Sequence, residues 1–372
     1  MVTWNNRRRL IVLLSGLLVW CSGLNAQDSL FYKHSLGLHL EHGYILPENS
    51  GLVYLVNRPV AAVSVTVLGQ SDGSHAWSRS WGLPQYGLMV RYGSLGNKKV
   101  FGHEFSVVPV FRFPVMRNKW FQMHVQTGLG LGRVSRRFTL EDNFLNLVVG
   151  ARTSLHYSLR VELEHMVHKQ LQVHAGLGLE HLSNANLAQP NIGINNLGAF
   201  GGVRWKINQT VRLPSVSQIV ESVESGPEVV FGAGMKRRRA YDPILYPAFS
   251  LYGEWKWPLS EKIILGAGGD LFFDGSGRTD ADTRLDGIKP DAAYDVRLSS
   301  GLHLSQEFRY RKLGMILQEG LYLGLKDVVS GERIYHRGIF RHYLNNHWMV
   351  QLSMKSHWFV LDFAEIGVGY KW

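Results

Sequence analysis

A two-residue alternation of apolar and polar side chains recurs along most of this 372-residue chain. Between 155 and 164 the apolar residues are Leu155, Tyr157, Leu159, Val161 and Leu163, and every residue between them is polar. Such alternation is typical of β-strands, because successive side chains point to opposite faces. Strands of about ten residues are long enough to cross a bilayer when tilted. The pattern therefore predicts an all-β, antiparallel transmembrane barrel whose apolar face meets lipid.

Turn-forming residues separate the alternating segments and define about sixteen expected strands, with twelve or fourteen as alternatives. We expect one barrel domain over 27–372. The strands are predicted near 35–46, 59–70, 86–95, 103–116, 119–132, 147–165, 170–183, 195–207, 228–240, 247–258, 262–273, 296–310, 313–325, 335–344, 348–356 and 362–372. The content of 40 glycines and 12% aromatic residues agrees with close-packed strands and interfacial aromatic girdles.

Both ends of the chain indicate export to an outer membrane. Three arginines precede an apolar run from Leu10 to Trp20, which predicts a signal peptide over 1–26. That run is shorter than the roughly 20 residues of a membrane-spanning helix. The only cysteine, Cys21, lies inside the expected signal, so we expect no disulfide. The last segment alternates up to the terminal aromatic Trp372, which resembles the signal that barrel-assembly machinery reads.

Net charge and connection lengths indicate which surface the protein meets and how the barrel is oriented in the membrane. The net charge of +11 favours an anionic lipid surface over nucleic acid for an exported chain. Tight links occur near 117–119, 168–170, 260–261, 311–312 and 345–346, and all follow even-numbered expected strands. Outer-membrane barrels keep short turns in the periplasm, so the odd-numbered strands should end outside.

The segment 171–195 carries the strongest functional signal. His181 and Ser183 continue the apolar face that includes Leu177 and Leu179, whereas Glu180 belongs to the opposite, inward face. In a transmembrane barrel this arrangement directs a histidine and a serine toward lipid near the outer leaflet. Imidazole, with a pKa of about 6.5 in water, is suited to take the proton of a serine hydroxyl. We therefore expect a nucleophile and its base on the membrane face.

The run His181-Leu182-Ser183-Asn184-Ala185, followed by 189–191 and 193–195, resembles the H-x-S-N-A and P-N-x-G signature of PagL-type lipid A 3-O-deacylases, also called acyloxyacyl-hydrolase-like proteins. The segments 354–357 and 362–372 are similar to that family's final strands, and the length resembles a longer Bacteroidetes-like branch. The resemblance implies hydrolysis of the ester-linked 3-hydroxyacyl chain of lipid A, without a metal or other cofactor.

The same resemblance assigns roles to five residues. Ser183 is the expected nucleophile, His181 its base, and Asn184 and Asn191 the expected oxyanion donors. The best-known members carry a glutamate fourteen residues after the histidine, where this chain has Asn195. An amide can orient an imidazole but cannot stabilise its cation by charge, so weak activity is expected unless another carboxylate substitutes.

Two other function classes stay open at this point. One is a passive or porin-like barrel with a decayed site, which Asn195 favours. The other is a barrel that binds carbohydrate or a partner through its outer loops. The acidic loop with Asp280, Asp282 and Asp286 misses the spacing of a calcium loop, and the basic run 236–239 is either a solvated rim or a contact for lipid A phosphates.

Overall fold

Sixteen antiparallel strands and two short helices make up the described part of the protein. The computed structural model describes residues 32–47, 50–74, 76–118, 120–209, 224–237, 244–260, 262–276, 297–310, 312–323, 333–357 and 360–372. The expected signal peptide, the acidic loop 280–286 and residues 238–239 of the basic run lie outside these residues. No helix within the described ranges is long and apolar enough to cross a membrane.

The elements of the first half are β1 (Tyr32–Ile45), α2 (Ser50–Leu55), β2 (Val60–Gln70), α3 (Ala76–Ser80), β3 (Gln85–Ser94), β4 (His103–Arg117), β5 (Phe121–Val134), β6 (Thr153–His168), β7 (Leu171–Ser183) and β8 (Ile194–Gln209). Those of the second half are β9 (Gly226–Lys236), β10 (Tyr246–Pro258), β11 (Ile263–Asp274), β12 (Leu298–Tyr310), β13 (Leu313–Tyr322), β14 (Ile334–Tyr343), β15 (Trp348–His357) and β16 (Val360–Lys371). The expected strand number is confirmed, and each strand overlaps its predicted range.

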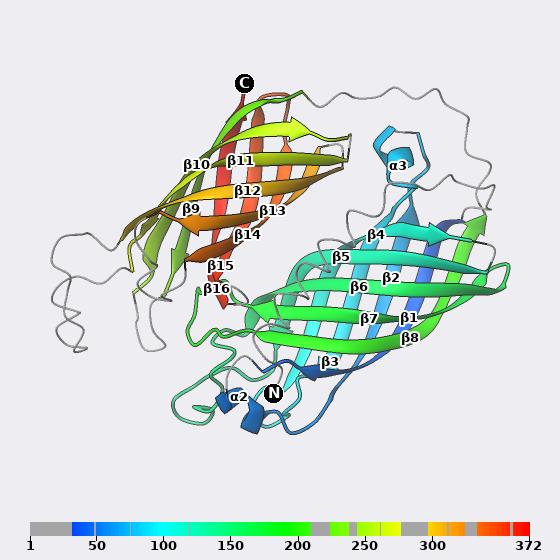
Figure 1. Ribbon diagram of the computed structural model, residues 1–372. Helices are drawn as coiled ribbons and strands as arrows, with labels where there is room; N and C mark the ends of the chain where they lie inside the picture. The colour runs from blue at the N-terminus through cyan, green and yellow to red at the C-terminus, as the bar shows by residue number, and fades with distance from the viewer. Residues whose placement is uncertain are drawn as a thin grey trace.

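The strands close into two barrels of eight instead of the single barrel expected over 27–372 (Figure 1). In the first barrel β8 pairs back with β1, from Tyr32↔Gln209 to Ile45↔Asn196. In the second barrel β16 pairs with β9. Alternation decides which side chains share a face, but it does not decide which strands close the sheet, so the sequence pattern was compatible with either closure.

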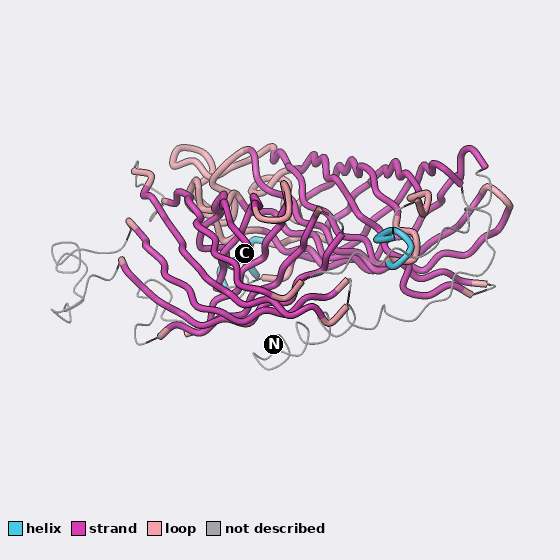
Figure 2. The backbone as a smooth tube through the Cα atoms, turned by 90° about the horizontal axis from the view of Figure 1, so that it is seen from above, coloured by secondary structure: helices cyan, strands magenta, loops and turns pink. Residues whose placement is uncertain are grey.

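The backbones of β1 and β8 approach each other closely where the first barrel closes after eight strands. A Cβ atom on Gly202 would lie 1.9 Å from the carbonyl oxygen of Leu38, so only glycine fits at this point of the β1–β8 seam. Viewed from above, nearly all of the described backbone is strand (Figure 2).

Apolar side chains point outward and charged side chains point inward in both barrels. Leu40, Leu177 and Leu304 are exposed, whereas Arg160 and Arg341 are among the largest fully buried side chains. The buried guanidinium groups are paired, as in the bonds from Arg160 to Glu41 at 2.7 Å and to Glu180 at 2.8 Å. Eight-stranded barrels are just wide enough for side chains to fill. The interiors are therefore packed with ion pairs.

The two barrels contact each other at both ends. Beside α3, Trp81 packs against Phe113 of β4 and Tyr310 of β12, with ring centroids 5.3 and 4.5 Å away. The Trp81 Nε1 also donates to the carbonyl oxygen of Arg309 at 2.9 Å. At the opposite end, the loop between β7 and β8 contacts the second barrel through Asn186.

Candidate active site

Strand β7 brings His181 and Ser183 to one end of the first barrel, away from the short turn at 169–170. Along this strand Val173, Ala175 and Leu177 are exposed, while the residues between them are half-buried or buried. Leu177 is 63% exposed. His181 and Ser183 have the same parity as these exposed residues, but His181 is half-buried and Ser183 is buried, so neither is open to lipid as the alternation alone predicted. Glu180 points inward and bonds Arg160 and His156.

His181 is held by its neighbour across the sheet. The register of β7 and β8 sets His181 directly opposite Asn195. The His181 Nδ1 and the Asn195 Oδ1 are 2.7 Å apart. Because an amide oxygen only accepts, this bond fixes the tautomer with the proton on Nδ1 and leaves Nε2 as the basic nitrogen. Asn195 thus occupies the place of an orienting residue, and it is neutral.

Ser183 is covered by the loop that follows it, residues 184–193, which we call the site loop. Its side chain is only 3% exposed. The Asn191 Nδ2 donates to the Ser183 Oγ at 2.9 Å, and the Asn191 Oδ1 accepts from the main-chain N–H of Asn184 at 3.0 Å. One amide therefore fixes both the serine hydroxyl and the start of the site loop.

Asn184 uses its side chain differently from Asn191. Its Nδ2 donates to the carbonyl oxygen of Ala188 at 2.8 Å, and its Oδ1 accepts from the N–H of Ala188 at 3.3 Å. This closes the first turn of the site loop. Of the two expected oxyanion donors, Asn191 has its amide nitrogen at the Ser183 hydroxyl and Asn184 is bonded within the loop.

Gly193 is a site residue whose role the sequence did not reveal. Its φ of 82° lies in the left-handed region that favours glycine. A Cβ atom here would lie 3.1 Å from the Cε1 of His181 and 3.7 Å from the Cβ of Ser183. Gly193 thus packs against both side chains, which lie on one small patch. The P-N-x-G spacing was the signal that could have identified this contact.

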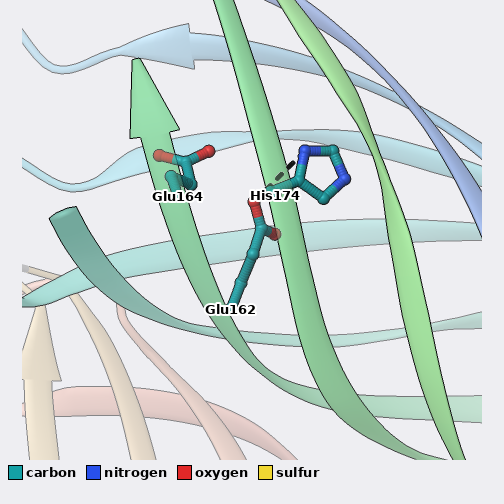
Figure 3. A group of neighbouring side chains, drawn as sticks. All are labelled: Glu162, Glu164 and His174. Atoms are coloured by element: carbon teal, nitrogen blue, oxygen red, sulfur yellow. Dashed lines mark ion pairs between the residues drawn. The ribbon is translucent and has the colours of Figure 1, made fainter. Parts of the chain in front are cut away.

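A second cluster, inside the first barrel, has the composition of a metal site. Glu162, Glu164 and His174 offer ligand atoms within 4.8 Å of one another. Figure 3 shows these side chains gathered on β6 and β7. However, Arg112 approaches Glu164 to 2.7 Å and Arg204 approaches Glu162 to 2.8 Å. Two guanidinium groups already balance the two carboxylates, so the cluster fits an interior ion-pair network and not a cation site.

Two models of known families match the chain. The model of the lipid A 3-O-deacylase (PagL) family matches residues 62–204, and the model of the acyloxyacyl hydrolase C-terminal domain matches residues 225–372. The chain belongs to the PagL family. The first match runs from β2 into β8 and the second begins just before β9, so the two matches fall on different barrels. The resemblance identified from the H-x-S-N-A motif is confirmed.

The chain also matches solved structures of outer-membrane and surface proteins. The outer membrane enzyme PagL is 18% identical, with 46% of this chain and 99% of that chain covered, at a TM-score of 0.31. Neisserial surface protein A is 11% identical, with 48% and 100% covered, at 0.34. Omp33 of Acinetobacter baumannii is 8% identical, with 93% and 99% covered, at 0.18. No curated protein matches the chain.

Proposed function

We propose that this PagL-family barrel is an outer-membrane serine esterase that removes an ester-linked 3-hydroxyacyl chain from lipid A. The observation that carries the proposal is that His181 and Ser183 both lie against Gly193 on one face of β7, with Asn191 bonded to the Ser183 hydroxyl. A lipid substrate reaches this face of the barrel sideways from the membrane, and its contact with the buried Ser183 hydroxyl requires the site loop to shift.

The proposed chemistry pairs His181 with Ser183, which lie two residues apart on the same face of β7; the hydrogen bonds of the structure join His181 to Asn195 and Ser183 to Asn191. His181 Nε2 takes the proton as the Ser183 Oγ attacks the ester carbonyl carbon. The Asn191 Nδ2 stabilises the oxyanion that forms, and Asn184 is the further expected donor. The sugar hydroxyl leaves with the proton from His181, and an acyl-serine remains. Water then attacks the acyl carbon and gives a proton to His181, and His181 passes this proton to the departing Ser183 Oγ as the 3-hydroxy fatty acid is released.

Packed barrel interiors argue against the passive-channel alternative. In the described residues, Arg160, Glu41 and Glu180 form buried ion pairs in the first barrel, and Arg341 and Glu228 do so in the second. An open pore requires a water-filled lumen, which larger barrels provide.

The proposal further includes removal of residues 1–26 as a signal peptide and recognition of the Trp372 strand by barrel-assembly machinery.

The test is hydrolysis of lipopolysaccharide by the full-length mature chain in bilayers, from about pH 6 to 9. Mass spectrometry of lipid A should show loss of one 3-hydroxyacyl chain. Ser183→Ala and His181→Ala should each abolish release, and their double variant should be no slower than either, because residues of one catalytic unit are not additive. Heat-modifiable migration on gels should remain, since neither side chain belongs to the packed interior. Intact lipid A with the wild type at every pH would refute the proposal.

A further inference from the structure

The site loop is bonded to the second barrel as well as to the first. Asn186 Nδ2 donates to the carbonyl oxygens of Asp362 at 2.6 Å and Leu361 at 3.2 Å. In return, the main-chain N–H of Arg237 donates to the carbonyl oxygen of Asn186 at 2.8 Å, and the Arg237 Nε donates to that of Leu187 at 2.9 Å. Main-chain groups of the second barrel and the Arg237 side chain thus fix the middle of the site loop.

The backbone of the site loop needs such support. Ala185 and Asn186 adopt φ values of 58° and 63°, consecutive left-handed conformations that side-chain-bearing residues disfavour. Asparagine tolerates this region better than most residues, but alanine does not. These two residues lie directly between Asn184 and the segment that returns to Asn191. A change at Asn186 is therefore transmitted to the residue that contacts the Ser183 hydroxyl.

The part of the second barrel that holds the loop is itself braced. Asp362 accepts a hydrogen bond from Lys355 at 2.6 Å and another from Lys236. Lys236 also bonds Asp274 of β11 at 2.7 Å. These ion pairs connect β9, β11, β15 and β16 at one end of the barrel. The carbonyl that accepts from Asn186 consequently belongs to a residue with little freedom to move.

We propose that the second barrel is the positioning element of the active site and that Asn186 is its positioning residue. This inference rests on the proposed esterase function. By bonding the site loop to the rim formed by Arg237, Leu361 and Asp362, the second barrel keeps the Asn191 amide at the Ser183 hydroxyl. This gives the second barrel a role in a chain whose expected catalytic residues all lie on the first barrel.

The test is Asn186→Asp in the full-length mature chain. Aspartate has nearly the same size and also tolerates left-handed backbone, but it loses the donor and sets a carboxylate against two carbonyl oxygens. We expect kcat for lipid A to fall about 10- to 100-fold, the scale of a misplacement of about 1 Å, with KM changed by less than about threefold. Hydrogen exchange of the 184–193 amides should become faster.

The matched control is Gln70→Glu, the same amide-to-carboxylate change at the opposite end of the first barrel. Gln70 Nε2 donates to the carbonyl oxygen of Leu83 at 2.6 Å, so a comparable bond is lost. Its activity and the exchange of 184–193 should match the wild type. If the wild type is active and Asn186→Asp retains its kcat, the inference is refuted. If the wild type is inactive, the proposed function fails, and exchange alone decides: unchanged exchange refutes the inference, and faster exchange in Asn186→Asp alone supports it.

Discussion

Asn195→Asp tests whether a missing charge limits catalysis. The Asn195 Oδ1 lies 2.7 Å from the His181 Nδ1, and an aspartate oxygen has the same reach. The substitution therefore adds negative charge without changing the length of the side chain. When His181 takes the serine proton it becomes a cation, which a carboxylate stabilises and an amide does not. We expect a faster acylation step.

The size of the gain can be bounded. A neutral hydrogen bond contributes about 0.5–1.5 kcal/mol and one to a charged group about 1.5–3 kcal/mol, so the difference is about 1 kcal/mol, or about fivefold in rate. The upper bound is the factor of about 10⁴, or about 5.4 kcal/mol, that the reverse change costs in a serine protease. Asn195 is only 7% exposed, so little water screens the new charge. A gain of at least fivefold in kcat/KM is therefore expected.

The assay is the initial rate of 3-hydroxy fatty acid release from lipopolysaccharide bilayers. Asn195→Glu should also raise the rate, but less, because its additional methylene has to be accommodated against the His181 ring. The control is Asn195→Asp combined with His181→Ala, which should gain nothing, because the charge acts through the imidazole. A folded Asn195→Asp protein that is slower than the wild type would show that the amide is the adapted residue.

Three further outcomes follow from the geometry. Gly193→Ala should reduce activity at least tenfold, because a left-handed φ is strained for alanine and the methyl group would press on His181. The variant should still show heat-modifiable migration on gels, and wild-type activity would contradict the prediction. Leu177→Cys should react with a membrane-soluble maleimide and Gly178→Cys should not, and the reverse labelling would mean that the register is shifted by one residue. Trp81→Ala should lower the free energy of unfolding by about 3 kcal/mol and Trp81→Phe by about 1 kcal/mol, measured by urea titration; equal losses would contradict the packing seen against Tyr310.

The local pattern of the sequence was sufficient for the strands and for the faces of their side chains. A period of two is a property of the extended backbone itself, so the outward phase of Leu177 and the inward phase of Glu180 follow from parity alone. The motif from His181 to Asn195 was also readable, because its residues lie on two consecutive strands and the loop between them. Residues that are so close in sequence could be recognised as one motif without knowledge of the tertiary structure.

Tertiary structure decided how the strands close and what supports the site. The pairing of β8 with β1 spans the whole first half of the chain, and no local pattern encodes a partner at that separation. The bond between Asn186 and Asp362 joins residues 176 positions apart, so the role of Asn186 could not be read from its neighbours. The face to which a side chain points is fixed by the local backbone geometry of its strand. The closure of each barrel and the support of the site loop depend on which distant segments approach closely enough to form hydrogen bonds.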